Sequence, residues 1–332
     1  MNYLTKSILV WVAYLTFPIM SASVYPNARE IPEINPEWTK AFISQGSLQN
    51  ETSDDFTSCI SLHHWATYDD GPGLYITEVI DKLNKLGKKG TFFFVRSYIL
   101  ANRETLKYAY ESAHQICSHT WSHRDLRRLT NDQIVAEIVW TSKLIHEIIG
   151  VVPACIRAPY GSLDGRVRGI LHALGLDIIS WNNDTLDYIL TYSEESYYVG
   201  TGFKLSDTAE KVIPPLFETW IAELPMTGTI SLQHDGCDLS APGIVPSLDV
   251  LMKANHTMIK VSECINRPEY SNFIMDKISN VANKTNSEAI ARDSKPGTST
   301  TQPSSSPNAT ADDGAYKLSS TLSKSDSDEW AC

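Results

Sequence analysis

The chain has 332 residues, of which 42% are hydrophobic and 20% are charged. This suits one large globular domain with a substantial core plus some appended sequence, and a second domain is possible but not required. A formal net charge of -11 argues against a nucleic-acid-binding protein, because such proteins concentrate Lys and Arg on one face. A polymeric partner is therefore expected to be neutral or cationic.

The first 23 residues are typical of a secretory signal peptide. Lys6 precedes an apolar run over residues 8–20, and small residues follow at 21–23. This order predicts cleavage after Ser23. An uncleaved membrane anchor is the alternative, but the run is short and Pro18 interrupts it. We expect a secreted protein, extracellular or in the cell wall, with no transmembrane segment in the mature chain.

After an N-terminal extension over residues 24–58, short apolar runs alternate with longer amphipathic stretches. This pattern predicts strand and helix units around a parallel sheet. In chain order, the expected strands are 60–68, 91–95, 115–118, 154–157, 177–180, 229–233 and 257–261. The expected helices are 77–86, 130–149, 164–174 and one that Ser206 could cap and that reaches residue 222, and the helix over 130–149 is the best marked. Thr130 and Gln133 are expected to form a capping box, and Gly150 to end that helix. Seven strands with intervening helices predict an α/β fold, a distorted (β/α) barrel, although the pattern alone does not separate it from an open doubly wound sheet.

The expected catalytic domain covers residues 59–270. From about Thr285 the composition shifts to Ser, Thr, Pro, Asn and Asp with almost no large apolar residues. Such a segment cannot bury enough surface to offset its ordering entropy. We therefore expect residues 271–332 to form a disordered, Ser/Thr-rich tail.

Secretion makes the cysteines candidates for disulfides rather than thiol catalysts, because the extracellular space is oxidising. They are Cys59, Cys117, Cys155, Cys237, Cys264 and Cys332. Cys117 and Cys155 lie near the ends of two expected strands, where neighbours in a parallel sheet could approach. They could equally be buried thiols, and Cys117 could be a soft metal ligand. N-glycosylation sequons at Asn50, Asn183, Asn255, Asn283 and Asn308 are consistent with a secreted eukaryotic glycoprotein.

Polar clusters follow five of the expected strands. They are Asp69-Asp70-Gly71-Pro72, His119 to His123, Arg157 to Gly161, Asp184 to Asp187, and His234-Asp235. Each alone has a simpler explanation, such as a turn, a chance pair of histidines or a solvated loop. In a parallel β/α architecture, however, these strand ends converge on one face, where active sites are built. We therefore expect the five clusters to line one pocket.

The residue types in these clusters suit hydrolysis assisted by a metal ion. His119, His123 and one carboxylate form a ligand set that leaves positions open for water and substrate. Only one of Asp69 and Asp70 is needed as a ligand, so the other is free to act as a base. A metal ion lowers the pKa of a bound water, whose proton the base can take. His234 can then supply a proton to a leaving amine.

This arrangement resembles the polysaccharide deacetylase family, also called the NodB homology domain or carbohydrate esterase family 4, and within it the fungal chitin deacetylases. The resemblance covers residues 59–266. Its five motifs occur in order as Thr67-Tyr68-Asp69-Asp70-Gly71-Pro72, Ser118-His119-Thr120-Trp121-Ser122-His123, Arg157-Ala158-Pro159-Tyr160-Gly161, Asp184-Thr185-Leu186-Asp187-Tyr188 and Leu232-Gln233-His234-Asp235. The resemblance implies that Asp69 is the catalytic base and His234 the catalytic acid. It also implies that Asp70, His119 and His123 hold a divalent metal ion, most often zinc, with cobalt as the second possibility.

The resemblance implies supporting roles for further residues. Arg157 would hold Asp69, Asp187 would pair with His234 and raise its pKa, and the backbone N–H of Tyr160 would stabilise the oxyanion. Tyr160, Tyr188 and Leu232 would contact substrate, the last two as walls of an apolar pocket for the acetyl methyl.

Three further expectations come from the same resemblance. Tyr188 stands where the family usually has Trp, which could alter the fit of substrate. Cys59 and Cys264 would form a disulfide that ties the start of the barrel to its end. Asn183 lies inside the fourth motif, so we predict that this sequon carries no glycan.

The implied reaction removes N-acetyl groups from N-acetylglucosamine units of chitin or chito-oligosaccharides and yields chitosan and acetate. A monomer is expected. Two alternatives stay open: deacetylation of another polymer, such as peptidoglycan or acetylxylan, and an inactive cell-wall glycoprotein that binds glycan.

Overall fold

The computed structural model describes residues 31, 36–43, 55–59, 64–223, 228–236 and 239–293. The expected signal peptide, Cys237, Cys332, the sequons at Asn50 and Asn308, and the chain after residue 293 lie outside this part. Within the described residues, no helix has the length and apolar character that a membrane span requires.

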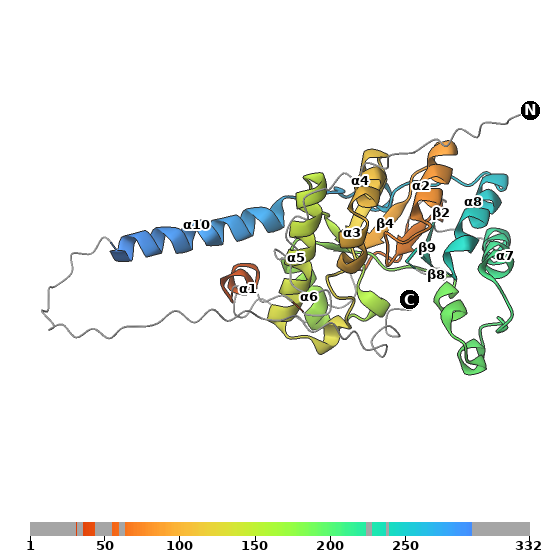
Figure 1. Ribbon diagram of the computed structural model, residues 1–332, viewed down its shortest axis with the longest axis horizontal. Coiled ribbons are helices and arrows are strands. Elements are labelled where there is room, and N and C mark those ends of the chain that lie inside the picture. The colour runs from red at the N-terminus through yellow and green to blue at the C-terminus, as the bar shows by residue number, and fades with distance from the viewer. Residues whose placement is uncertain are drawn as a thin grey trace, which may run out of the picture.

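The strands form one curved sheet at the centre of the molecule (Figure 1). They are β1 (Ser58–Cys59), β2 (His64–Trp65), β3 (Thr67–Asp69), β4 (Thr91–Phe94), β5 (Gln115–Ser118), β6 (Cys155–Ile156), β7 (Asp177–Ile178), β8 (Asn183–Asp184) and β9 (Gly228–His234). The main order is β1-β9-β3-β4-β5-β6-β7, and β2 and β8 also pair with β9. Only the pairing of β1 with β9 is antiparallel among these strands.

One extended segment brings the two edges of this sheet together. Its first part, β7, pairs with β6, and its second part, β8, pairs with β9 in the register Asn183 opposite Ser231. Phe56 forms a parallel bridge with Ile179 beside it. These pairings confirm the expected distorted (β/α) barrel over an open sheet.

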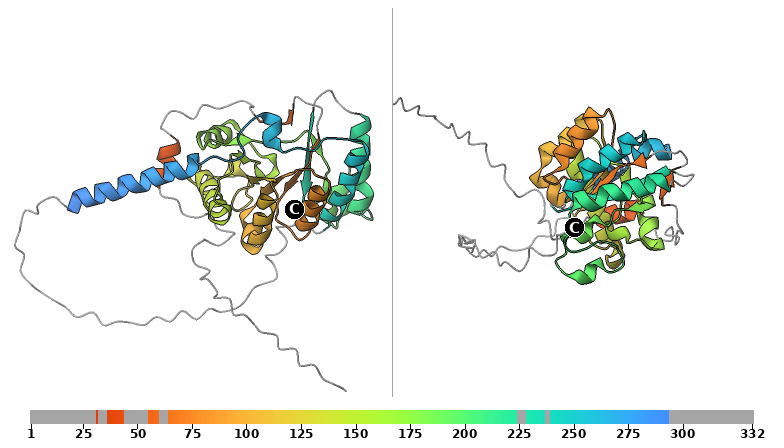
Figure 2. Two further views of the ribbon diagram at one scale, coloured as in Figure 1. Left: turned by 90° about the horizontal axis from the view of Figure 1, so that it is seen from above. Right: turned by 90° about the vertical axis from the view of Figure 1, so that its right-hand side faces the viewer.

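Helices surround the barrel (Figures 1 and 2). They are α1 (Pro36–Phe42), α2 (Ile76–Lys85), α3 (Arg96–Ala101), α4 (Arg103–Glu111), α5 (Asn131–Ile149), α6 (Gly165–Ala173), α7 (Ala209–Ala222), α8 (Ile244–Lys253), α9 (Val261–Ile265) and α10 (Phe273–Asp293). The predicted ends of α5 are confirmed: Thr130 and Gln133 form the capping box, and Gly150 follows with a φ of 76°. Helix α7 begins at Ala209, slightly later than the predicted residue 206.

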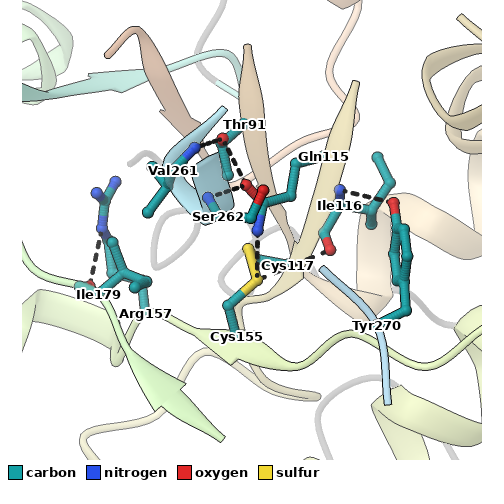
Figure 3. Close-up of a disulfide and its surroundings, with 10 residues drawn as sticks. All are labelled: Thr91, Gln115, Ile116, Cys117, Cys155, Arg157, Ile179, Val261, Ser262 and Tyr270. Atoms are coloured by element: carbon teal, nitrogen blue, oxygen red, sulfur yellow. Dashed lines mark hydrogen bonds between the residues drawn. A yellow bond between two sulfur atoms is a disulfide. The ribbon is translucent and has the colours of Figure 1, made fainter. Parts of the chain in front are cut away.

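The strand predicted over residues 257–261 is wrong. Only Met258 forms a bridge there, and α9 begins at Val261. The first amides of α9 donate to side chains of the barrel rather than to a neighbouring strand: Val261 N to Thr91 Oγ1 at 3.0 Å and Ser262 N to Gln115 Oε1 at 2.9 Å (Figure 3). These bonds satisfy donors that a helix start leaves unpaired, so the segment closes one end of the barrel as a helix.

Ordered structure also continues beyond Tyr270, where the sequence predicted a disordered tail from residue 271. Helix α10 occupies residues 273–293 and projects from the domain beside α1 and α5 (Figure 1). Ile274 and Ile278, one turn apart, are buried in the same apolar cluster as Phe42 of α1. This spacing puts both isoleucines on one face of the helix, which the composition shift near residue 285 did not reveal.

Side chains of the barrel strands alternate between two apolar clusters. Phe92 and Phe94 pack outward with the helices, whereas Phe93 packs inside the barrel with Cys117 and Cys155. Cys117 and Cys155 form a disulfide between β5 and β6, with their Cα atoms 5.1 Å apart (Figure 3). Neither is therefore a free thiol or a metal ligand.

Cys264 is also disulfide-bonded. The side chain of Cys59 is not among those described, so the pairing of these two cysteines stays a prediction.

Candidate active site

The candidate site lies at the carboxyl ends of the barrel strands. His119 follows Cys117 by two positions, Arg157 follows Cys155 by two, and Asp69 pairs with His234 in the register of β3 and β9. Since side chains two apart on a strand face the same side, the inward-facing positions end in these polar groups. The polar clusters thus form the uppermost layer of the barrel interior, above the disulfide.

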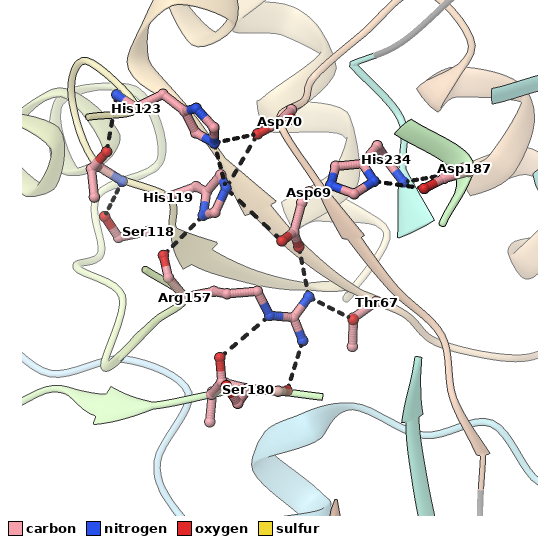
Figure 4. A network of polar contacts seen from close by, with 12 residues as sticks. Thr67, Asp69, Asp70, Ser118, His119, His123, Arg157, Ser180, Asp187 and His234 are labelled. Atoms are coloured by element: carbon pink, nitrogen blue, oxygen red, sulfur yellow. Dashed lines mark hydrogen bonds and ion pairs between the residues drawn. The ribbon is translucent and has the colours of Figure 1, made fainter. Parts of the chain in front are cut away.

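Three side chains meet at one edge of this layer (Figure 4). Oδ1 of Asp70 lies 3.2 Å from Nε2 of His119 and 3.1 Å from Nε2 of His123, and the two Nε2 atoms are 3.2 Å apart. The residues come from the loops after β3 and β5, and all three are mostly buried. They form the one group of candidate ligands for a metal ion found among the described residues.

This cluster fits a divalent ion. Oδ1 of Asp70 is buried, and among the described residues it faces only the two imidazole nitrogens, an arrangement that a shared metal ion would satisfy. At zinc–ligand distances of roughly 2.0–2.1 Å, ligand atoms at tetrahedral angles lie about 3.3–3.4 Å apart. The observed separations of 3.1 to 3.2 Å are close to that value. Three protein ligands are the number typical of a catalytic zinc site, which keeps a further position for water or substrate.

The electrostatics of the cluster favour ligand character. Burial alone raises the pKa of Asp70, but the two imidazoles outweigh burial and hold this pKa well below its usual value. Nδ1 of His119 lies 2.9 Å from the backbone oxygen of Arg157, which requires a proton on Nδ1. With Nδ1 as the donor, the neutral imidazole of His119 presents the lone pair of Nε2 to the cluster.

Backbone strain concentrates around these residues. Asp70, Thr120, His123, Tyr160 and Leu186 all have positive φ values, between 54° and 72°. Residues other than glycine rarely adopt this backbone conformation, so local contacts must stabilise it. Asp235 supplies one such contact, because its buried carboxylate accepts a bond from Gly73 N at 3.1 Å in the loop that follows Asp70.

Asp69 lies beside the ligand cluster and is held by a buried arginine. Nη1 of Arg157 donates to Oδ1 of Asp69 at 2.6 Å and to Oγ1 of Thr67 at 2.8 Å. The same guanidinium donates to the backbone oxygens of Ile179 and Ser180 at 3.3 and 3.1 Å. Oδ2 of Asp69 lies 3.9 Å from Nε2 of His119. One carboxylate oxygen is thus fixed by Arg157 while the other faces the ligand cluster (Figure 4).

His234 lies across from this pair and is held by Asp187. Nδ1 of His234 is 2.7 Å from Oδ1 of Asp187, and the backbone N–H of His234 donates to Oδ2 at 2.8 Å. Asp187 is fully buried in the short helix η3 (Asp187–Thr191). Burial alone lowers the pKa of His234, but the charge and hydrogen bond of Asp187 outweigh burial, and with Asp70 and Asp69 they raise it to about 10. The imidazole is therefore protonated at neutral pH.

The predicted substrate contacts lie at the rim or in the wall of this site. Tyr160 is 65% exposed, and its ring centre lies 4.7 Å from that of His123. The Tyr188 ring stands edge-on to His234 at 5.6 Å. Leu232 is buried on β9, where its backbone oxygen accepts bonds from Thr185. The two tyrosines thus flank opposite sides of the polar layer, next to the ligand cluster and next to His234.

Asn183 lies on β8 and is half-buried. With its amide turned to satisfy its neighbours, it donates to the Asn182 backbone oxygen at 3.2 Å and accepts from Nε1 of Trp220 at 3.3 Å. An attached glycan would disrupt these contacts, so they support the prediction of an unmodified Asn183.

Two features of the site were missed from the sequence. The first is the backbone oxygen of Arg157, which orients His119 and leaves no signal in residue types. The second is Glu137, a buried carboxylate on α5 that accepts bonds from the loop carrying both histidines. Its signal was available, because Glu137 is the single charge within the apolar run 134–139.

Comparisons with known proteins identify relatives of this chain. Residues 63–179 match the family model described as polysaccharide deacetylase. Chitin deacetylase 1 of Cryptococcus neoformans var. grubii is 34% identical over 239 residues, which cover 69% of this chain and 49% of that protein. Chitin deacetylase 1 of Saccharomyces cerevisiae is 30% identical over 257 residues, covering 74% of this chain and 77% of that protein. The chain therefore spans about half the length of the first relative and about three quarters of the second.

Among solved structures, the chitin deacetylase of the fungal pathogen Colletotrichum lindemuthianum superposes with a TM-score of 0.55. The match covers 65% of this chain and 95% of that one at 24% identity. At this level of identity the likeness establishes the barrel fold alone.

Proposed function

This chain belongs to the polysaccharide deacetylase family, and we propose that it is a metal-dependent hydrolase that removes N-acetyl groups from chitin to give chitosan and acetate. The observation that carries the proposal is the convergence of a ligand cluster, a base held by arginine and an acid held by aspartate at one end of the barrel. A wall-binding protein without activity would need only a glycan-binding surface, so this complete set favours an enzyme.

Chitin is the proposed substrate because the curated relatives that match most of the chain are named chitin deacetylases. The net charge of -11 is compatible with a neutral polymer and a cationic product. Peptidoglycan and acetylxylan are the alternative polymers, since the core residues set the reaction while the surrounding loops set the substrate. Secretion to the extracellular space or cell wall is part of the proposal, supported by the disulfide between Cys117 and Cys155.

Asp70, His119 and His123 would hold the metal ion, with zinc first and cobalt second among the candidates. When bound, the ion would supply Lewis acidity toward the acetamide carbonyl and toward a water molecule. His119 is prepared for this role because the Arg157 backbone oxygen fixes its tautomer.

The chain's own groups would move the protons. Asp69, held by Arg157, takes a proton from the attacking water, whose oxygen bonds to the carbonyl carbon. When the carbon–nitrogen bond breaks, His234 donates its proton to the leaving nitrogen. The products are acetate and a free amine on the sugar. Asp187 keeps His234 protonated before this step.

The remaining predicted residues would bind the reacting group. The backbone N–H of Tyr160 would donate to the developing oxyanion. Leu232 and the ring of Tyr188 would enclose the acetyl methyl, and the exposed ring of Tyr160 would contact the sugar. We expect the enzyme to act as a monomer.

The proposal is tested by acetate release from three polymers under one set of conditions: chitin oligomers, peptidoglycan glycan strands and acetylxylan. We expect the highest rate on chitin oligomers, loss of activity with a chelator, and recovery when zinc is restored. A higher rate on another polymer would replace the substrate and keep the reaction. No release from any polymer by metal-loaded protein would favour the inactive glycan-binding alternative.

A further inference from the structure

The loop that carries His119 and His123 has no regular secondary structure, so each of its backbone N–H groups needs a separate acceptor. Three of them find acceptors within the loop or on adjacent strands. His119 N donates to the Phe94 backbone oxygen at 3.0 Å, Thr120 N to Ser118 Oγ at 3.3 Å, and His123 N to Thr120 Oγ1 at 3.2 Å. The two N–H groups at the centre of the loop remain.

Those two groups, on Trp121 and Ser122, both donate to Oε2 of Glu137 at 2.8 Å. The Ser122 hydroxyl also donates to Oε1 of the same carboxylate. Glu137 thus joins helix α5 to the middle of the loop through three bonds. One ligand histidine precedes the bonded pair, and the other follows it.

Glu137 is fully buried among the apolar residues of α5. Burial raises the pKa of this carboxyl group, and a buried carboxylate without donors would be strongly unfavourable. An apolar residue would pack at this position on the helix without that cost. The carboxylate is therefore better explained by the loop that it binds than by the helix that carries it.

We propose that Glu137 is a positioning residue for the metal site. Its three bonds fix the backbone between the ligands and so set the 3.2 Å separation of the two histidine Nε2 atoms. Thr120 and His123 have left-handed φ values of 72° and 54°, which the loop would relax if its central N–H groups lost their acceptor. The inference rests on the proposed metal-binding function of His119 and His123 and adds a residue that orients both.

The experiment measures zinc affinity by competition with a chromogenic chelator, and the visible absorption of the cobalt-substituted protein. Glu137→Ala is expected to weaken zinc binding about 10- to 100-fold, as for other groups that orient metal ligands, and to change the cobalt spectrum. Glu137→Gln is expected to stay within about threefold of wild type. Its amide oxygen can accept both backbone bonds, and its amide nitrogen can donate to Ser122 Oγ.

Ile138→Ala is the matched control, because Ile138 is the next residue on α5 and equally buried, but it packs in an apolar cluster. Losing its side chain should lower the melting temperature while leaving zinc affinity unchanged. This control separates loss of helix packing from loss of ligand geometry. Glu137→Asp is the second test, for the case in which the alanine variant does not fold. This substitution keeps the charge but shortens the side chain by one methylene group. We expect it to bind zinc more weakly than Glu137→Gln does.

Wild-type zinc affinity and an unchanged cobalt spectrum in folded Glu137→Ala would overturn the inference. If that variant does not fold, equal zinc affinity in the Asp and Gln variants would do so. Failure of the wild-type protein itself to bind zinc or cobalt would instead refute the proposed metal site, so the two failures are distinguishable.

Discussion

The two proposed proton-transfer groups, Asp69 and His234, are each held by a partner of opposite charge, but in different ways. In the base half, Arg157 holds Asp69 and is itself bonded to Thr67 on the same strand and to Ile179 and Ser180 in the segment after β7. In the acid half, both oxygens of Asp187 bond to one residue, His234. Arg157 is therefore anchored to several groups of the barrel, whereas the carboxylate of Asp187 is bonded to one partner residue.

Because of this difference, we expect substitutions in the base half to change the geometry of the site and substitutions in the acid half to change the pKa of His234. Removing Arg157 would leave several buried acceptors without a donor, so its loss would disturb the barrel as well as the base. Removing the charge of Asp187 would change mainly the pKa of His234. Substitutions in the two halves should consequently fail in distinguishable ways.

The largest effect is expected from Asp69→Asn in the base half. Asn has nearly the same shape and keeps an oxygen for Arg157, but it cannot take a proton from water. Acetate release should fall roughly 10²- to 10⁴-fold, with metal content unchanged by elemental analysis. Substantial activity in a metal-loaded Asp69→Asn variant would rule out Asp69 as the base.

His234→Asn, in the acid half, should cost roughly 10²-fold or more on an N-acetyl substrate, because the leaving amine needs a proton. An aryl acetate ester has a leaving group that departs without protonation, so this variant should retain most of its activity on the ester. Asp69→Asn should lose activity on both substrates. Equal losses by His234→Asn on amide and ester would contradict its role as the acid.

Asp187→Asn should move the alkaline limb of the pH–rate profile to lower pH. An acid works while it is protonated, and the pKa of about 10 keeps His234 protonated well above neutrality. Without the charge of Asp187, that pKa should fall toward its ordinary value near 6.5, because burial acts in the lowering direction. At pH 8 the protonated fraction would then drop roughly 30-fold, while activity at pH 6 would change less. An unmoved alkaline limb would show that another group sets it.

The smallest effect is expected from Tyr188→Trp, which introduces the larger ring usual in the family. Tyr188 touches the edge of His234 but transfers no proton in this account. We expect a change of a few-fold in KM and little change in kcat, since a contact made equally in the ground state and the transition state changes binding rather than the chemical step. A 100-fold loss of kcat would instead implicate the Tyr188 hydroxyl in the chemistry.

The sequence predicted most strands and the strand ends that meet in the site, because apolar runs and polar strand exits are local features. The pattern alone did not separate a barrel from an open sheet, because the pairing of β8 with β9 that decides it is nonlocal. The strand at 257–261 was wrong for a nonlocal reason: the amides of Val261 and Ser262 find acceptors on Thr91 and Gln115, far away in the chain. The helix after residue 272 was missed because its contacts with α1 and α5 outweigh its polar composition.

Within the site, residue types predicted the groups that carry charge but not the contacts that orient them. The backbone oxygen behind His119 belongs to Arg157, and any residue there would offer the same atom. Glu137 lies on a helix whose pattern indicates only a buried face, and its partners on the loop become apparent in three dimensions. Positioning contacts depend on tertiary packing and are therefore the part of a site that a single sequence reveals least.

Mass spectrometry of products from chitin oligomers of defined length, with and without a chelator, tests the central claim most directly. We predict products in which acetyl groups are replaced by hydrogen, formed together with an equal amount of acetate, and formed only when a divalent ion is present. Unchanged oligomers after incubation with zinc-loaded protein would contradict the proposed deacetylation. Deacetylated products that persist after complete removal of metal would contradict the role of Asp70, His119 and His123.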